Sequence, residues 1–474
     1  MQTTDSVFRK PLEAALENAM AHLESLDRTP VAATVDLATL RNRIGRALQD
    51  DGVAPEQVVA DLVKDVEGGI LGSAGGRFFG WVIGGSVPAA LAADWLTSTW
   101  DQNSGHHSCG PAAAVVEEVS GKWLKEILGL PAHASFALVT GCQMAHVTCL
   151  AAARHAILTK RGWDVEKQGL YGAPPIRVVT SDKRHETFDR AIRLLGMGLS
   201  QVEYLPADSQ GQLPANALEQ ALKADSSVPT IVLLQAGDVN TGKYDSFETL
   251  IPIAKHFAAW VHVDGAFGLW AAASSRYRHL VRGVADADSW ATDGHKWLNV
   301  PYDCGYAFVA NANAHRASMS SQAAYLTHDG DARDQLDWTP EWSRRARAFP
   351  TYAALRELGR NGVSNLVERC CAHAYSLVME IGRLPGAQVV SAPVINQGLV
   401  RFLDPKPGAS DADHDRRTEE VIAAILASGE AFFGGTTWRG RRAMRVSVSC
   451  WLTSKEDVRR VVMAVAQVLS VEKD

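Results

Sequence analysis

The sequence predicts an α/β fold: a large domain on a mainly parallel sheet, a small C-terminal α+β domain and an N-terminal helical arm. Three patterns predict it: apolar runs alternating with helical stretches from about residue 89 to 310, a helix and alternating strands after about 345, and an amphipathic helix before both. At 474 residues the chain exceeds what one hydrophobic core usually supports. We therefore expect an arm over 1–75, a large domain over 76–345 and a small domain over 346–474.

The helical arm is predicted from apolar residues at steps of three and four near the N-terminus. They are Leu12, Leu16, Met20, Leu23 and Leu26. A helix with such a stripe needs an apolar surface to cover it. That surface is either a second subunit or the helix's own domain, and the sequence leaves both open.

The sheet of the large domain is predicted from five short apolar runs. They span residues 135–140, 176–180, 230–236, 259–264 and 305–310. Strands that are apolar throughout, with helices between them, are typical of parallel sheets covered on both faces. Ligands of such sheets bind beyond the carboxyl ends of the strands, where we therefore seek the site.

The small domain is predicted from a helical stretch over 349–381 and three later runs, AQVVSA, QGLVRFL and AMRVSVSCW. These runs have the alternating pattern of strands with one exposed face. We expect helices packed on a small antiparallel sheet.

Composition and charge exclude several classes of protein. The chain is 46% hydrophobic, and its net charge of −6 is spread without long runs of one sign, so nucleic acid is not an expected partner. No run reaches the roughly 20 apolar residues of a membrane span. Seven cysteines are few and odd in number, which favours free thiols and a cytoplasmic protein. The run His106-His107-Ser108-Cys109 lacks a second ligand pair at zinc-finger spacing, so no metal site is predicted.

A glycine-rich segment, residues 68–88, precedes the alternating pattern and carries Phe79 and Trp81. Glycine lets backbone approach a ligand closely, and aromatic rings supply flat apolar walls, so the segment is a candidate for a substrate pocket. A structural hinge with buried aromatic side chains fits the same residues.

Four features at strand ends each meet a requirement of a phosphorylated pyridine aldehyde. The first is the turn Gly141-Cys142-Gln143 between a strand and a helix. Free N–H groups and the helix dipole attract an anion there, although many such turns bind nothing. The second is His185, which follows the next strand and either stacks on a planar ring or caps a helix.

The third feature is Asp264, the carboxylate that ends the strand at 259–264. It suits a protonated pyridine nitrogen, although metal-binding and helix-capping residues also occupy strand ends. The fourth is Lys296, 32 residues later in apolar sequence. Desolvation lowers the pKa of such an amine and lets it form an imine with an aldehyde. A single lysine is ordinarily a surface residue, but the four features in this order point jointly to pyridoxal 5′-phosphate (PLP).

The sequence around these residues resembles the group II PLP-dependent amino-acid decarboxylases, which include aromatic-L-amino-acid and glutamate decarboxylases. The resemblance covers roughly residues 70–450. The matching strings are RFFGWVIGGSVPAALAADWL (77–96), SDKRHETFDRA (181–191), HVDGAFG (262–268), DGHKWLNVPYDCG (293–305) and SRRARAFPTYAALRELGRNGV (343–363). It implies the fold-type-I PLP-dependent transferase fold with a seven-stranded sheet, and a homodimer whose active sites use both subunits.

The resemblance also implies the roles of the site residues. Lys296 is the Schiff-base lysine, Asp264 pairs with the pyridine nitrogen, and His185 stacks on the ring. Further cofactor contacts expected from it are Gly141, Cys142, Gln143, Ala266 and His295. The implied activity is decarboxylation of an L-amino acid to its amine.

Two turns depart from the family pattern. The phosphate turn has Gln143 and His146 where many relatives have a small or hydroxyl residue and Asn, a change that backbone contacts to phosphate would survive. The turn after the run 230–236 carries Asp238 and Asn240 in place of a Gly-Thr-Thr string. Either these two residues contact the cofactor or substrate, or they only shape the turn.

The segment 326–345 matches the catalytic loop of aromatic decarboxylases but is shorter. In that family a loop tyrosine reprotonates the α-carbon, and its position falls near Gln335 here. Tyr325, ten residues upstream, is the candidate substitute. Loss of the tyrosine is associated in the family with an aldehyde product. Aldehyde synthesis, or an aminotransferase-like reaction, therefore stays open beside decarboxylation.

The substrate is predicted from a few residues only. Arg445 either clamps a carboxylate through its two-pronged donor geometry or is structural. Phe79 and Trp81 favour a bulky or aromatic amino acid. The remaining alternative, a catalytically silent binding protein, is disfavoured because Asp264 and Lys296 are both present.

Overall fold

A computed structural model describes residues 4–320 and 332–471 of the chain, and its centre is a seven-stranded sheet. The strand order is β1-β7-β6-β5-β4-β2-β3. The strands are β1 (Ser135–Val139), β2 (Arg177–Ser181), β3 (Val202–Leu205), β4 (Thr230–Gln235), β5 (Trp260–Asp264), β6 (Ser289–Asp293) and β7 (Gly305–Val309). Strand β7 is antiparallel to both neighbours, and the other adjacent pairs are parallel. The predicted mainly parallel sheet of seven strands is confirmed.

The five apolar runs correspond to β1, β2, β4, β5 and β7, whereas the sequence analysis missed β3 and β6. Strand β3 is short and lies at the edge of the sheet, with two of its four residues exposed. Strand β6 reads SWATD and is buried throughout, but its polar residues hide it from an apolar pattern. These polar residues form hydrogen bonds in and beside the site, such as that of Asp293 with Cys142 N and that of Ser289 with Trp260.

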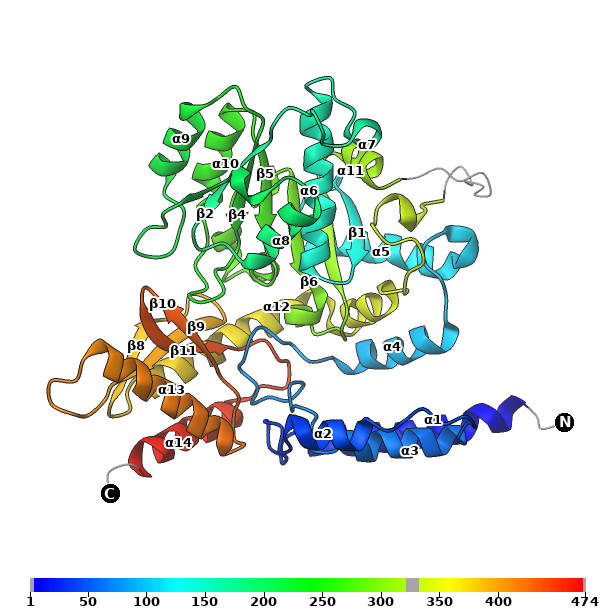
Figure 1. Cartoon of the computed structure of the whole chain (residues 1–474), viewed down its shortest axis with the longest axis vertical. Coiled ribbons are helices and arrows are strands. Elements are labelled where there is room, and N and C mark those ends of the chain that lie inside the picture. The colour runs from blue at the N-terminus through cyan, green and yellow to red at the C-terminus, as the bar shows by residue number, and fades with distance from the viewer. Residues whose placement is uncertain (1–3, 321–331, 472–474) are drawn as a thin grey trace.

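Helices cover both faces of this sheet (Figure 1). Adjacent residues of β1 point to opposite sides, so Leu138 packs in one hydrophobic cluster and Val139 in another. The second cluster includes α6 (Cys142–Thr159), α7 (Val165–Gln168), α8 (Glu186–Leu194) and α11 (Ala312–Met319). The first includes α5 (Pro111–Ile127), α9 (Ala215–Ala224) and α10 (Phe247–His256).

The C-terminal part forms a four-stranded antiparallel sheet with the order β10-β11-β9-β8. Its strands are β8 (Ala387–Ser391), β9 (Gln397–Phe402), β10 (Gly434–Trp438) and β11 (Arg441–Ser447), and its helices are α12 (Ala348–Ile381), α13 (Asp411–Ala427) and α14 (Lys455–Val471). The predicted α+β pattern is confirmed, with β10 added. Helix α12 is kinked at Gly359, whose φ of 58° favours glycine. The hydrophobic cluster of α5 and α10 continues into this part, so the two sheets share a core.

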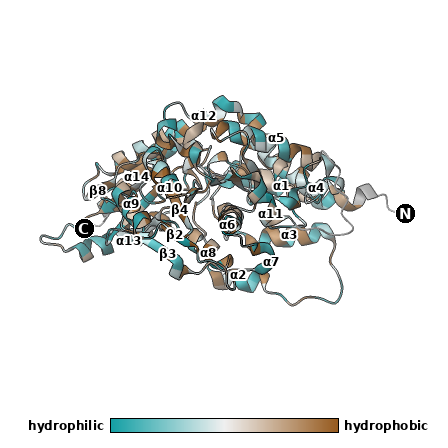
Figure 2. Cartoon of the chain, turned by 90° about the horizontal axis from the view of Figure 1, so that it is seen from above, coloured by the Kyte–Doolittle hydropathy of each residue, from teal (hydrophilic) through white to brown (hydrophobic). Residues whose placement is uncertain are grey.

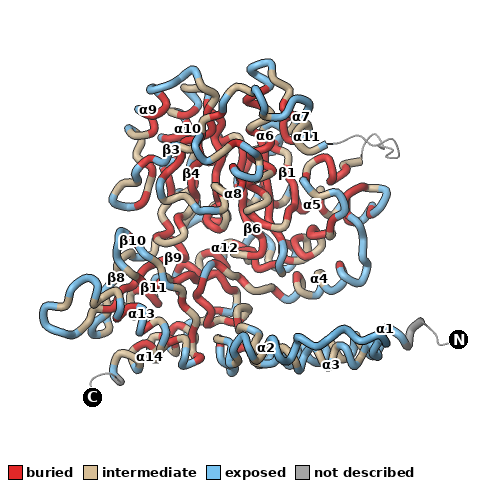
Figure 3. Tube along the Cα trace, viewed as in Figure 1, coloured by how far each residue is buried: buried red, intermediate tan, exposed pale blue. Residues whose placement is uncertain are grey.

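The N-terminal helices extend along one side of the molecule as the predicted arm (Figure 1). They are α1 (Thr4–Ser25), α2 (Leu37–Ile44) and α3 (Pro55–Val66), and α4 (Pro88–Trp100) leads into the large domain. Figure 3 shows α1 to α3 as largely exposed, and hydrophobic residues are visible on α3 in Figure 2. The apolar stripe of α1 is uncovered in the single chain, since Leu12 is 54% and Leu16 49% exposed.

Short helical turns connect the longer elements. They are η1 (His107–Cys109), η2 (Leu199–Gln201), η3 (Gly268–Ala273), η4 (Arg278–Val281), η5 (Val284–Asp286), η6 (Gly294–Leu298) and η7 (Gln335–Asp337). Among the described helices, none is both long and apolar enough to cross a bilayer. The boundaries expected at residues 75 and 345 stay predictions.

Candidate active site

A cavity of about 310 Å³ lies at the carboxyl ends of the central strands. Its volume is within the range of small-molecule sites, which starts near 300 Å³. It is lined by Thr140, Gly141, Cys142, Gln143, His185, Thr187, Gln235, Gly237, Val239, Asp264, Ala266, Phe267, Asp293, His295 and Lys296. All four sequence features therefore meet at one place, because parallel strands end at one edge of the sheet.

Lys296 lies on the single helical turn η6, directly after β6, and its amine faces Asp293. The Lys296 Nζ atom is 3.1 Å from Asp293 Oδ2. Burial lowers the pKa of this lysine, but the charge and hydrogen bond of Asp293 and the charge of Asp264 act in the opposite direction, and the pKa is raised. The lowering by desolvation that the sequence analysis expected is thus opposed by Asp293, to which the sequence analysis gave no role.

Asp264 ends β5 and is buried, with both oxygens in use. Its Oδ1 accepts a hydrogen bond from Ala266 N at 3.1 Å, and its Oδ2 lies 3.5 Å from His146 Nε2. Burial raises the pKa of the Asp264 carboxyl, but His146, His185 and Lys296 outweigh burial and hold it well below the ordinary value. Asp264 is thus a buried, ionised carboxylate on the cavity wall.

The turn between β1 and α6 presents the start of a helix to the cavity. The first N–H groups of an α-helix have no acceptor within the helix, so they attract an anion. One of them, Cys142 N, donates to Asp293 Oδ1 at 2.6 Å. A Cβ on Gly141 would lie 3.0 Å from Cε1 of His295, so glycine is needed for this close approach.

Two histidines line the cavity, and their hydrogen-bond partners differ. His185 caps α8 by accepting from Thr187 N, and its exposed ring leaves a face open to the cavity. His295 accepts from Cys304 N at 3.2 Å through Nδ1, and its ring stacks on Tyr302 at a centroid distance of 4.2 Å. The two hypotheses for His185, capping and stacking, are compatible in this geometry.

Asp238 does not line the cavity, although its neighbours Gly237 and Val239 do. Its Oδ1 accepts from Asn240 N, Thr241 N and Thr241 Oγ1, so it shapes the turn after β4. Asn240 Oδ1 in turn accepts from Thr436 Oγ1 on β10. The geometry supports the alternative in which these residues shape the turn, and cofactor contact by Asp238 stays a prediction without support here.

The predicted substrate residues are not brought to the cavity in this single chain. Phe79 is fully buried in the core beside Phe433, and Trp81 is 54% exposed and packs on Phe432. Arg445 lies on β11 and Gln335 on η7, and neither lines the cavity. Their roles as substrate contacts stay predictions, and Tyr325 lies outside the described residues.

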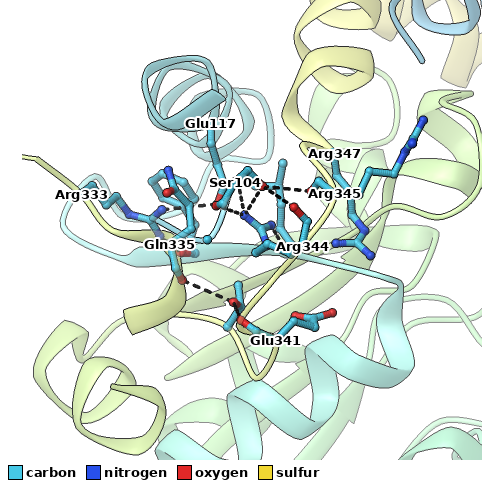
Figure 4. Close-up of polar contacts among 12 residues, drawn as sticks. Ser104, Glu117, Arg333, Gln335, Glu341, Arg344, Arg345 and Arg347 are labelled. Atoms are coloured by element: carbon cyan, nitrogen blue, oxygen red, sulfur yellow. Dashed lines mark hydrogen bonds and ion pairs between the residues drawn. The ribbon is translucent and has the colours of Figure 1, made fainter. Parts of the chain in front are cut away.

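The segment that carries Gln335 is held by a buried ion cluster, which we call the anchor cluster and define as Glu117, Arg333 and Arg344. Glu117 Oε2 is 2.7 Å from Arg344 Nη1 and Glu117 Oε1 is 3.4 Å from Arg333 Nη1. Figure 4 shows the contacts of Arg344 with Glu117 and Ser104. Both arginines also donate to backbone carbonyls of β1. The cluster therefore attaches residues 333–345 to α5 and to β1.

Sequence reasoning missed three polar residues of the site, Asp293, His146 and His262. Asp293 ends a strand just as Asp264 does, and that position was the available signal. His146 and His262 are buried at the sides of Asp264, where only the fold brings them together. Cys142, His146 and Asp264 also place three possible metal ligands within 4.8 Å of one another. Burial raises the pKa of the Cys142 thiol well above its ordinary value, which disfavours the thiolate that a metal needs.

The residues around the cavity fit pyridoxal phosphate. Lys296 supplies an amine, Asp264 supplies a buried negative charge, and the N-terminus of α6 supplies N–H groups for a phosphate. Fold and site together define the class of PLP-dependent enzymes of fold type I.

The chain belongs to the pyridoxal-dependent decarboxylase family. The model of the pyridoxal-dependent decarboxylase conserved domain matches residues 38–403, which is most of the chain. The protein is accordingly a PLP-dependent carboxy-lyase, as the sequence analysis predicted.

Several characterised proteins are similar to it over nearly their whole length. An aromatic-L-amino-acid decarboxylase of Bacillus atrophaeus is 24% identical, over 95% of this chain and 93% of the relative. Tryptophan decarboxylase 1 of Oryza sativa is 28% identical, over 95% and 91%. A 4-hydroxyphenylacetaldehyde synthase of Rhodiola rosea is 25% identical, over 92% and 90%. The crystal structure of Oryza sativa TDC with PLP and tryptamine has the same fold, with a TM-score of 0.93, 22% identity and full coverage of both chains.

Proposed function

We propose that this carboxy-lyase decarboxylates an aromatic or bulky L-amino acid to the corresponding amine. The observation that carries the proposal is the meeting of Lys296, Asp264 and the α6 N-terminus at one cavity. The tryptophan, tyrosine and aromatic-amino-acid decarboxylases among its relatives support an aromatic substrate.

Each site residue has a task in this reaction. Bound PLP supplies an electron sink for the electron pair of the broken Cα–carboxylate bond. Lys296 would hold the cofactor through its amine, and the negative charge of Asp264 would keep the pyridine nitrogen protonated. His185 and Ala266 line the same cavity and would contact the ring, and the 141–143 turn and His295 would hold the phosphate.

We also propose that the protein is a homodimer in which the arm, residues 1–75, covers a second copy. The uncovered apolar residues of α1 and α3 support this arrangement, for example Leu12 and Leu62, which are 54% and 58% exposed. All seven cysteines are free, which supports a cytoplasmic location. Light scattering of the purified protein should give twice the mass of the chain.

The product assay tests the proposed reaction. The purified protein with added PLP should convert tryptophan, tyrosine or phenylalanine to CO₂ and the amine. The amounts of CO₂ and amine should be equal, and no ammonia should form. Glutamate is the control substrate and should react far more slowly. Release of CO₂ from glutamate alone would contradict the proposed substrate class.

Aldehyde synthesis is the second candidate, because the loop position of the family's tyrosine falls near Gln335. The similarity to 4-hydroxyphenylacetaldehyde synthase from Rhodiola rosea is compatible with it. In that case the same assay would consume O₂ and water and yield the aldehyde, ammonia and hydrogen peroxide together with CO₂, and no amine would accumulate.

A further inference from the structure

A row of buried polar side chains runs from the core to Asp264, and the proposed reaction gives it no task. His146 Nδ1 lies 2.9 Å from His262 Nε2, and His262 Nδ1 lies 2.9 Å from Ser289 Oγ. Trp260 Nε1 donates to the same Ser289 oxygen at 2.9 Å. We call His146, His262 and Ser289 the imidazole chain.

The imidazole chain is shielded from solvent. His146, His262 and Ser289 are each 0% exposed. Phe188 of α8 packs against both rings, edge-on to His146 at 6.3 Å and stacked on His262 at 6.5 Å between centroids. In such surroundings an unpaired polar atom is costly, so every donor must have an acceptor.

This requirement limits the directions that the hydrogen bonds can take. Asp264 is ionised and can only accept, so the His146 Nε2 that faces it carries a proton. The other nitrogen, Nδ1, lies 2.9 Å from His262 Nε2, and in the arrangement that we propose it accepts from that atom.

The rest of the chain follows from the same rule. Burial lowers the pKa of His262 well below its ordinary value, so this ring is neutral and its Nδ1 accepts from the Ser289 hydroxyl. The Ser289 oxygen accepts from Trp260. In this arrangement each donor of the imidazole chain has an acceptor, and the donors point toward Asp264. Cys142 Sγ also lies 3.6 Å from His146 Nε2 and donates to Asp264 Oδ1 at 3.9 Å.

We propose that His146 is a positioning residue that directs an N–H at Asp264 Oδ2, and that His262 and Ser289 hold His146 in the tautomer needed for it. Oδ2 is thereby fixed against His146 and Oδ1 against Ala266 N, so the carboxylate keeps one orientation and its negative charge. The inference rests on the proposed function only in that Asp264 faces the PLP ring.

Three substitutions of His146 test the roles of its two ring nitrogen atoms separately. In H146Q the amide nitrogen replaces Nε2 and keeps the donor to Asp264. In H146N the amide oxygen replaces Nδ1 and keeps the acceptor for His262 but loses the donor to Asp264. H146L removes both. A merely structural role would make H146N and H146Q equivalent, since each keeps one polar contact.

The readout is the dissociation constant of PLP, measured by absorbance titration of the cofactor-free protein. We expect H146N and H146L to bind PLP about 10- to 100-fold more weakly, because a hydrogen bond to a charged group is lost. H146Q should stay within about threefold of the wild type. Equal affinities of H146N and H146Q would overturn the proposal.

A matched control removes another buried histidine. His315 is also 0% exposed, contacts Ser135 Oγ at 2.8 Å and Trp338 O at 2.9 Å, and does not line the cavity. H315L should lower the melting temperature of the cofactor-free protein as H146L does, while its PLP affinity stays at the wild-type value. Weaker PLP binding in H315L, equal to that in H146L, would also overturn the proposal.

Nitrogen-15 NMR of histidine-labelled, cofactor-free protein tests the tautomers without any activity measurement. The signals of His146 and His262 are assigned by their loss in H146Q and H262N, and both should show a proton on Nε2. A proton on Nδ1 of His262 would overturn the proposed direction. If the wild type itself fails to bind PLP, the proposed function fails, which is a different result from any of these.

Discussion

The cavity and the anchor cluster both centre on buried carboxylates, but their partners differ. Glu117 has an arginine on each oxygen, and those arginines also donate to Ser104 and to carbonyls of β1. At the cavity, the Lys296 amine has three donors, and Asp293 is its ion-pair partner among the described residues. The remaining donors point to a space large enough for a ligand.

The difference separates a structural charge cluster from a functional one. In the anchor cluster each charge lies against an opposite charge, which offsets the cost of burial, so the cluster joins α5, β1 and the 333–345 segment. An amine with open donors and a carboxylate of fixed charge keep binding capacity for a cofactor. The following substitutions test that distinction.

Lys296→Ala should have the largest effect. Removal of the amine should lower decarboxylation by about three orders of magnitude or more, because no other side chain at the cavity can replace a covalent nucleophile. The measurement is CO₂ release with saturating substrate and PLP. Activity above one tenth of the wild type would contradict the role of Lys296.

Glu117→Gln should have the opposite profile. It leaves Arg333 and Arg344 buried without a counter-charge, and breaking a buried pair in this way costs about 3–5 kcal/mol. Chemical denaturation of the cofactor-free protein should show this loss in the free energy of unfolding. In the protein that remains folded, PLP affinity should be unchanged, and a large loss of affinity would mean that the two regions are coupled.

The sequence predicted the fold where apolar patterns were strong. Strands β1, β2, β4, β5 and β7 are continuous apolar runs and were found, whereas β6 was missed because Ser289, Thr292 and Asp293 interrupt its pattern. These polar residues are stable inside the sheet only because partners from other elements reach them, such as Trp260 for Ser289. A single sequence does not contain that information in local form.

The features of the site likewise fall into those that the sequence could predict and those that it could not. Lys296, Asp264, His185 and the 141–143 turn were predictable because each follows a strand and has a distinct chemistry. The charge state of Lys296 was not predictable, because it depends on Asp293 at 3.1 Å as well as on burial. The role of Asp238 was left open by the sequence, and in the structure its carboxylate accepts hydrogen bonds from Asn240 and Thr241 within the same turn.

Asp293→Asn should have an effect of intermediate size, which is measured as a change in the pH dependence of PLP capture. Asp293 helps to raise the Lys296 pKa above its ordinary value of 10.5, so the charged amine stabilises the fold at neutral pH and this contribution is lost only as pH rises above that value. Without the carboxylate, the strongest influence that raises the Lys296 pKa is removed while burial remains, so the pKa should fall.

The measurement is the rate at which the cofactor-free protein captures PLP as a function of pH. Because the neutral amine is the nucleophile, the rising limb of this profile should move to lower pH in D293N. The amide introduced by D293N keeps an oxygen that can accept from Cys142 N, so the turn itself should be preserved. An unchanged profile would mean that Asp293 does not control the charge of Lys296.

Glu126→Gln should have the smallest effect, and it is the closest control for Glu117 because both glutamates lie on α5. Glu126 pairs with Arg360, but their side chains are 55% and 64% exposed. Water already solvates both charges, so the free energy of unfolding should change by about 0.5 kcal/mol or less. The two substitutions remove the same charge from the same helix and differ only in burial. A loss of unfolding free energy in E126Q as large as that in E117Q would show that the helix, and not the buried arginines, determines the loss. The difference drawn between the anchor cluster and the cavity would then have no physical basis.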